Sequence, residues 1–124
     1  MIGIVGGIGS YAGIDLIRKI YDFSEVSCDQ DHLPVSMLSA PHKVVDRTQF
    51  LLGNISVNPG RAIGKIIQTL SSNGASIIGI PCNTAHAELI FNWIKIFGIN
   101  SSIDKPLELD FFLRFFVIYC GVLV

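Results

Sequence analysis

Short runs of consecutive apolar residues alternate along the chain with longer segments in which apolar residues recur every three or four positions. The short runs are typical of buried strands and lie at residues 2–5, 34–38 and 75–80. The periodic segments predict three helices, which follow a glycine-rich turn at 6–10, an Asn-Pro-Gly sequence at 58–60 and a cysteine at 82. Strands separated by helices indicate βαβ units. We therefore expect an α/β fold with a parallel sheet flanked by helices.

The periodicity of the predicted helices also assigns an apolar face of each one to the core. The residues that we expect to point inward are Ile14, Ile17 and Tyr21, with Leu16 and Ile20 beside them, in the first helix; Ala62, Ile63, Ile66, Ile67 and Leu70 in the second; and Leu89, Ile90, Trp93, Ile94 and Phe97 in the third. Asn73-Gly74 is expected to end the second helix, and Gly98 the third.

Composition narrows the class of protein. The chain has 124 residues, of which 50% are hydrophobic, and a formal net charge of −1, which fits one globular domain with a sizeable core. No cluster of lysine and arginine offers a surface for nucleic acid. The last apolar segment, 111–124, is interrupted by Arg114 and is too short to span a membrane. Three cysteines and no signal peptide before the first strand favour a reducing, cytoplasmic setting.

Cys82 is the residue that points most directly to chemistry. It follows the apolar run at 75–80 and Pro81, and it precedes the next predicted helix. Backbone N–H groups and the positive end of a helix dipole would favour its thiolate there. Asn83 and Thr84 are good capping residues and place hydrogen-bond donors beside the sulfur. The thiol could then act as a nucleophile or base; the alternative is a structural cysteine that closes a strand.

The expected parallel sheet brings three segments that are remote in the sequence to one edge. The loops after the strands, 6–10, 40–47 and 81–84, would open at the carboxyl edge of the sheet, where ligands bind. They supply glycine-rich backbone amides, the guanidinium of Arg47 and the thiol of Cys82. Because amides and a guanidinium bind carboxylates, this group suits a small anionic substrate with Cys82 at the carbon between its carboxylates.

Three motifs in these loops have a counterpart in a known family. They are MIGIVGGIGS at residues 1–10, Asp46-Arg47-Thr48, and PCNTAH at 81–86. With these motifs the chain resembles the aspartate/glutamate racemase superfamily, and its cofactor-independent aspartate racemases most closely, over about residues 1–97. The resemblance implies two pseudo-symmetric α/β domains with the active site between them, and no pyridoxal phosphate. We also expect no metal site. One cysteine from each domain would act as a base on opposite faces of the substrate Cα.

The resemblance also implies roles for individual residues. Cys82 would be the acid/base of the N-terminal domain, and Arg47 would pair with the distal carboxylate of aspartate or a similar small acidic amino acid. The other expected contacts are Asn83, Thr84 and Ala85 at the α-carboxylate and amino group, and Ile8, Gly9 and Ser10 at the floor of the site. Family members usually have Met-Gly-Pro at these last three positions. Isoleucine keeps apolar volume, and the loss of proline loosens the helix start.

The resemblance ends about halfway through a family protein. We therefore divide the chain into a racemase-like domain at 1–97 and an unmatched apolar tail at 98–124, as after a truncation or a shifted reading frame. Cys120 lacks the polar companions of the family's second cysteine motif, and Cys28 follows a helix at the wrong edge of the sheet. We expect this chain alone to self-associate through its apolar tail and not to racemise aspartate. The alternative function is a non-catalytic remnant that binds carboxylates.

Two other kinds of site remain open on the residues alone. Gly7, Gly9 and Ala12 match a loose dinucleotide-binding fingerprint, although no acidic residue follows the second strand to bind a ribose. Cys28 and Cys82 are each followed four residues later by a histidine, and four such ligands could hold zinc. Nothing in the predicted fold brings these two pairs together.

Overall fold

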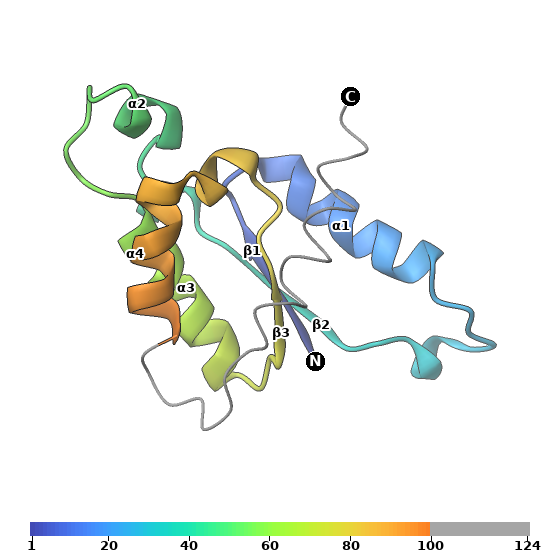
Figure 1. The fold of residues 1–124 in the computed structure, drawn as a ribbon. Helices are drawn as coiled ribbons and strands as arrows, with labels where there is room; N and C mark the ends of the chain where they lie inside the picture. Colours follow the sequence, from blue (N-terminus) through green and yellow to red (C-terminus); the bar gives the residue numbers. More distant parts are fainter. Residues whose placement is uncertain (100–124) are drawn as a thin grey trace.

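A three-stranded parallel sheet lies at the centre of the part of the chain that the computed structural model describes, residues 1–99 (Figure 1). The strands are β1 (Ile2–Gly6), β2 (Val35–Ser39) and β3 (Ile77–Gly79), and β1 lies between the other two. Ile2 is opposite Val35 in one pairing and opposite Ile77 in the other, and both pairings are parallel. The expected α/β fold with a parallel sheet is therefore confirmed.

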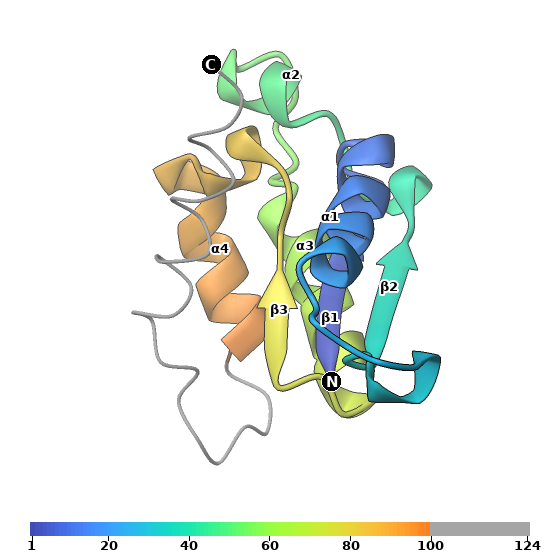
Figure 2. The ribbon, with the colours of Figure 1, turned by 90° about the vertical axis from the view of Figure 1, so that its right-hand side faces the viewer.

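Helices cover both faces of this sheet. The described residues form the α-helices α1 (Ser10–Asp22), α2 (Arg47–Leu51), α3 (Gly60–Ser72) and α4 (Glu88–Ile99). They also form three short 3₁₀ turns, at Asp29–Asp31, Pro41–Lys43 and Asn83–His86. Figures 1 and 2 show α1 on one face of the sheet and α3 with α4 on the other. The short helix α2 follows β2 and lies beyond the carboxyl end of the sheet.

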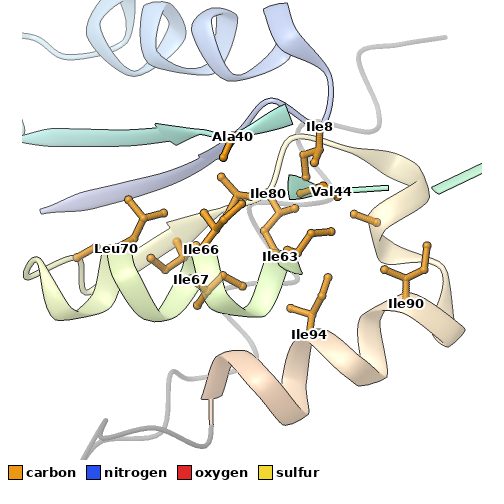
Figure 3. Packing of buried hydrophobic residues seen from close by; sticks show 14 residues of the cluster. Ile8, Ala40, Val44, Ile63, Ile66, Ile67, Leu70, Ile80, Ile90 and Ile94 are labelled. Atoms are coloured by element: carbon orange, nitrogen blue, oxygen red, sulfur yellow. The ribbon is translucent and has the colours of Figure 1, made fainter. Parts of the chain in front are cut away.

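The main core lies between the sheet and the two helices α3 and α4 (Figure 3). Burying an aliphatic side chain contributes about 1.5–3 kcal/mol, so this cluster is the principal source of stability. The side chains that α3 buries here are Ile63, Ile66, Ile67 and Leu70, and α4 adds Ile90 and Ile94. Ala62 is partly buried against the same cluster. The inward face predicted for α3 is therefore confirmed.

The inward face predicted for α4 is wrong in part. Ile90 and Ile94 are buried, but Leu89 and Trp93 are 65% and 41% exposed. Apolar residues occur on more than one side of this helix, so their spacing does not single out the face that packs. Contact with α3 decides which of them are covered. The helix α3 meets the side of α4 that carries Ile90 and Ile94, and the Cβ atoms of Trp93 and Phe97 also lie close to Gly60 and Gly64 of α3.

The inward face predicted for α1 is also wrong in part, although Leu16 is buried as predicted. Gly13 and Leu16 are buried, whereas Ile14 and Tyr21 are exposed. A Cβ atom at position 13 would lie 2.8 Å from the Sδ atom of Met37 on β2. The glycine therefore lets α1 approach the sheet closely. The side chains of Ile14 and Tyr21 lie outside this contact.

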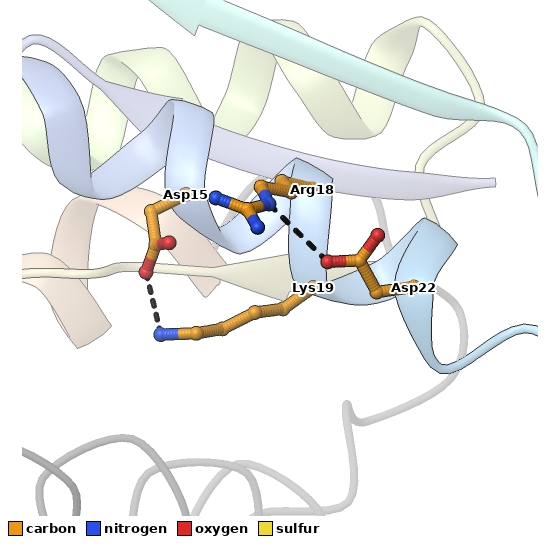
Figure 4. Close-up of polar contacts among 4 residues, drawn as sticks. All are labelled: Asp15, Arg18, Lys19 and Asp22. Atoms are coloured by element: carbon orange, nitrogen blue, oxygen red, sulfur yellow. Dashed lines mark hydrogen bonds and ion pairs between the residues drawn. The ribbon is translucent and has the colours of Figure 1, made fainter.

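The solvent-facing side of α1 carries two ion pairs, each spanning one helical turn (Figure 4). Arg18 Nε lies 3.3 Å from Asp22 Oδ2, and Lys19 Nζ lies 2.5 Å from Asp15 Oδ2. Exposed pairs with this spacing contribute about 0.3–0.5 kcal/mol each. They support the helix itself and do not determine where it packs.

Most of the predicted apolar tail lies outside the described residues. Of the tail, only residues 98 and 99 are described, and they complete α4. The aromatic-rich segment and Cys120 lie outside, so the domain boundary and the self-association remain predictions. Within residues 1–99, no helix combines the length and the apolar composition needed to cross a membrane.

Candidate active site

Three loops meet at the carboxyl edge of the sheet. Arg47, at the start of α2, donates a hydrogen bond from Nη2 to the carbonyl oxygen of Ile8, in the turn after β1, at 3.2 Å. The helix α2 also contacts the 3₁₀ turn Asn83–His86, which follows β3 and Cys82. The structure therefore brings together the glycine-rich turn, the guanidinium and the segment that carries the thiol. Parallel topology is the cause, because the segments that follow parallel strands emerge at the same edge.

The turn after β1 is shaped by close packing against the other two loops. Gly7 has a φ of +79°, and a Cβ atom there would lie only 2.8 Å from the backbone nitrogen of Pro41, in the loop after β2. On the other side, a Cβ atom at Gly9 would lie 3.6 Å from the carbonyl oxygen of Pro81, in the loop after β3. A larger residue at position 7 would strain the backbone and separate the loops.

The residues expected at the floor of the site contribute in different ways. The side chain of Ile8 is buried in the core (Figure 3), so Ile8 reaches the edge through its carbonyl oxygen, which accepts the bond from Arg47. Gly9 and Ser10 are exposed, and Ser10 is the first residue of α1. At this position the backbone, and not the side chain, faces the edge, and the floor formed by Ile8, Gly9 and Ser10 stays a prediction.

Cys82 is half-buried and has an extended backbone. Its Sγ atom lies 3.2 Å from the hydroxyl oxygen of Thr84, and its backbone N–H donates to the carbonyl oxygen of Ile80 at 2.8 Å. A hydroxyl group at this distance can donate a hydrogen bond to a thiolate when the thiol loses its proton. The cysteine is thus partly exposed, packs partly against the core, and has a hydroxyl group beside its sulfur.

The prediction that Cys82 begins a helix needs correction. Only a single 3₁₀ turn, Asn83–His86, follows it, and Ala87 then returns to φ −57° and ψ 135° before α4 begins at Glu88. The positive end of the α4 dipole is therefore separated from the sulfur by the intervening turn, and its effect falls off within one turn of the helix end. The local hydroxyl of Thr84, and not a helix dipole, is the nearest support for a thiolate.

Arg47 combines a fixed position with an unsatisfied donor. The carboxylate of Asp46 caps α2 by accepting a bond from the Gln49 N–H at 2.9 Å, which holds the start of this helix. Arg47 itself is half-buried, and its Nε atom is buried without a hydrogen-bond partner in the part of the chain that the structure describes. Leaving a buried donor unpaired costs about 1–3 kcal/mol, and more for a charged group. An anionic ligand would supply the missing acceptor.

The two remaining residues of the cysteine motif differ in exposure. Asn83 is exposed and Ala85 is completely buried, with its side chain in the core cluster. A substrate at this edge could meet the side chain of Asn83, but it could meet Ala85 only through the backbone. The apolar side chain of Ala85 instead anchors the turn to the core.

The structure gives His86 a place that the sequence did not reveal. Its Nε2 atom lies 3.1 Å from the carbonyl oxygen of Ile80, and its ring packs against that of Phe91 with centroids 5.3 Å apart. Burial lowers the pKa of His86, and the hydrogen bond with the Ile80 carbonyl offsets part of this effect. The signal in the sequence was the position of His86 in the PCNTAH motif, four residues after the cysteine.

The two cysteine–histidine pairs that could have held zinc lie at opposite edges of the sheet. Cys28 is exposed in the segment before β2, whereas Cys82 follows β3. Because the strands are parallel, the start of β2 and the end of β3 are at different edges (Figure 1). Over residues 1–99, no group of three or more His, Cys, Asp or Glu side chains is arranged to hold a metal ion.

The fold has a counterpart among proteins of known structure. No family model matches the chain. Among solved structures, the chain is similar to the aspartate racemase of Picrophilus torridus, with 35% sequence identity and a TM-score of 0.61. The match covers 68% of this chain but 36% of that protein, so this chain spans little more than a third of its length. The resemblance to the aspartate/glutamate racemase superfamily is therefore confirmed, and the chain has the fold of part of a racemase.

Proposed function

We propose that this chain supplies one side of the acid/base chemistry of a cofactor-independent amino-acid racemase, with Cys82 as the proton-transferring residue. The observation that carries the proposal is the arrangement of residues at the carboxyl edge of the sheet. There, the segment that bears a half-buried thiol contacts the helix whose first residue, Arg47, has a buried and unsatisfied Nε donor. The similarity to an aspartate racemase supports the same reading.

The proposed step is transfer of a single proton at Cα. The Cys82 thiolate removes the α-proton, the S–H bond forms as the C–H bond breaks, and the electron pair stays on Cα, delocalised into the α-carboxylate. Return of a proton from the thiol to the same face restores the starting enantiomer. The hydroxyl of Thr84, 3.2 Å from Sγ, would stabilise the thiolate form. No pyridoxal phosphate or metal takes part in the proposed step.

The proposed substrate is aspartate or a similar small acidic amino acid. Arg47 would pair with the distal carboxylate, since its guanidinium can bind both oxygens at once and its Nε needs an acceptor. The side chains of Asn83 and Thr84 and the backbone at Ala85 would bind the α-carboxylate and amino group. The backbone of Ile8 and Gly9, with Ser10, would form the floor.

A single base predicts exchange without inversion. Racemisation by this mechanism needs a second base on the opposite face of Cα, and within the described residues the other cysteine, Cys28, lies at the far edge of the sheet. We therefore expect the chain to exchange the α-proton of one enantiomer with solvent while its configuration is retained. Inversion would require a base contributed from beyond the described residues or from another chain.

The experiment is exchange of the α-proton in heavy water, followed by proton NMR and by chiral chromatography. L-aspartate and D-aspartate are incubated separately with the protein, and asparagine serves as the matched control because it lacks the distal carboxylate. We expect loss of the α-proton signal from one aspartate enantiomer, no inversion, and much slower exchange of asparagine. Equal exchange of asparagine would contradict the proposed substrate.

The second candidate function is a module that binds carboxylates without catalysing a reaction. The unsatisfied Nε of Arg47 favours it independently of the thiol, because an anion could bind there without any chemistry at Cys82. Protection of Cys82 from iodoacetamide by malonate, together with no α-proton exchange, would support this module and reject the catalytic role.

A further inference from the structure

We propose that His86 is a positioning residue that fixes the loop carrying Cys82 by donating a hydrogen bond from Nε2 to the carbonyl oxygen of Ile80. The inference rests on the proposed function only for its consequence in proton transfer, since the geometry of the loop does not depend on what the thiol does.

The carbonyl oxygen of Ile80 accepts two hydrogen bonds from the segment that follows it. One comes from the backbone N–H of Cys82 at 2.8 Å and the other from Nε2 of His86 at 3.1 Å. A carbonyl oxygen has two lone pairs, so both bonds can form together. The segment from Ile80 to His86 is thereby closed into a loop, and the cysteine lies inside it.

The donor in the second bond is fixed by chemistry. A carbonyl oxygen can only accept, so the proton must be on Nε2 of His86. Burial lowers the pKa of this imidazole, which favours the neutral ring in the neutral pH range. A neutral ring with its proton on Nε2 meets the requirement without placing a charge beside the thiol.

The ring of His86 is itself held in place. It is partly buried, and it packs against the ring of Phe91 on α4, with the ring planes inclined by 32°. The helix α4 is in turn anchored in the core by Ile90. The contact therefore connects the end of β3 to α4 across the cysteine loop.

The loop needs such a connection because no helix holds Cys82 directly. The 3₁₀ turn Asn83–His86 ends at Ala87, and α4 begins only at Glu88. The bonds to Ile80, the Cys82–Thr84 contact and the burial of Ala85 are among the interactions that hold this loop and the sulfur. The side chain of His86 spans this loop from its end to its start, at Ile80.

The test compares His86→Leu, which has no donor, with His86→Gln, whose amide can still donate to the carbonyl. Amide hydrogen exchange is measured by NMR at Cys82 and Ala87, whose N–H groups bond within this segment. Loss of one hydrogen bond of ordinary strength predicts roughly threefold to tenfold faster exchange in His86→Leu, and His86→Gln should return it to within about twofold of the parent. The amides of α3 should not change in either variant.

His32→Leu is the matched control, because His32 also packs against an aromatic ring, that of Tyr21, but far from the cysteine loop. Its exchange at Cys82 and Ala87 should equal that of the parent. If His86→Leu leaves these amides unchanged, or if His86→Gln does not restore them, the positioning role is wrong.

A second measurement needs no variant. Long-range nitrogen–proton correlation spectra of the parent protein should show His86 as the neutral tautomer with its proton on Nε2. A proton on Nδ1 alone would overturn the proposal. Neither measurement uses substrate, so failure of the proposed racemase chemistry, seen as no α-proton exchange of aspartate, is distinguishable from failure of the positioning role.

Discussion

Two cysteine–histidine pairs with identical spacing occupy different environments in this molecule. Cys28 and Cys82 each stand directly before a 3₁₀ turn. The histidine four residues later packs against an aromatic ring in both, with ring centroids 4.9 Å apart for His32 and 5.3 Å apart for His86. At the level of local structure the two segments are therefore close to equivalent.

The two segments differ in where they lie relative to the sheet. Cys28 precedes β2 and is exposed, whereas Cys82 follows β3, is half-buried and lies in a segment whose 3₁₀ turn contacts the helix that begins at Arg47. The Nδ1 atom of His32 is buried and has no hydrogen-bond partner among residues 1–99, whereas His86 bonds to the strand end. In a parallel sheet, the carboxyl edge collects the loops that bind ligands. Topology, and not spacing, separates the candidate active cysteine from an ordinary one.

The largest expected difference between the two pairs is catalytic. Cys82→Ser should reduce the α-proton exchange of aspartate by about 100-fold or more, since a positioned acid/base group typically contributes that much. Cys28→Ser should leave the rate unchanged. The measurement is the initial rate of deuterium incorporation by NMR. Equal losses in the two variants would remove the distinction on which the proposed site depends.

The next effect concerns the anion site. Malonate should protect Cys82, but not Cys28, from iodoacetamide, and Arg47→Lys should weaken this protection about tenfold because a point ammonium loses the bidentate geometry and the Nε donor. Arg18→Lys is the control, since Arg18 is exposed on α1 and paired with Asp22. The concentration of malonate that gives half-protection is read by mass spectrometry. Unchanged protection in Arg47→Lys would place the guanidinium outside the site.

A smaller effect is expected from the neighbour of the sulfur. Thr84→Val removes the hydroxyl 3.2 Å from Cys82 Sγ, and it should slow alkylation of Cys82 about threefold to tenfold while the alkylation of Cys28 stays constant. Thr84→Ser keeps the hydroxyl and should stay near the parent rate. The ratio of the two alkylation rates within each sample cancels differences in reagent. A slow Thr84→Ser variant would assign the effect to the lost methyl group instead.

The smallest effect is in the pH dependence of stability. Burial lowers the pKa of His86 in the folded state, so the unfolded chain binds the proton more readily. Stability from this residue is present above about pH 6.5 and decreases as the pH falls below it, toward the lower folded pKa. Urea unfolding at about pH 7.5 and about pH 5.5 should show a smaller loss of stability for His86→Gln than for the parent. An unchanged loss in His86→Gln would contradict the assignment.

The sequence predicted much of the fold because its signals there are local and unambiguous. The apolar run that ends at Ile80 and the alternation of runs with periodic segments led directly to a parallel α/β sheet. In α3 the apolar residues lie on one side only, so its inward face was predicted correctly. In α4 the apolar residues occupy neighbouring rows of the helix, so the sequence did not show that Leu89 and part of Trp93 would stay exposed while Ile90 and Ile94 are buried.

The position of the candidate site was also predictable from the sequence. The order of the strands and loops was enough to bring Arg47 and the segment of Cys82 to one edge. The details at that edge were not. The buried side chain of Ile8 depends on packing against segments far apart in the chain. The break at Ala87 and the bond from His86 to Ile80, six residues away, have no signal in the pattern of apolar residues.

By itself, the sequence determined the class of fold, the edge at which chemistry could occur and the resemblance to the racemase superfamily. The alternation of strands and helices along the chain and the short motifs that follow the strands can be read directly from the sequence. Only the tertiary structure decided how that edge is built: Arg47 donates a hydrogen bond to the carbonyl oxygen of Ile8, and its Nε is buried without a partner among residues 1–99. It also decided that the nearest support for the thiol is the hydroxyl of Thr84 and not a helix dipole. The physical reason is that burial and hydrogen-bond partners are set by what packs against a residue, and spacing along the chain does not record it.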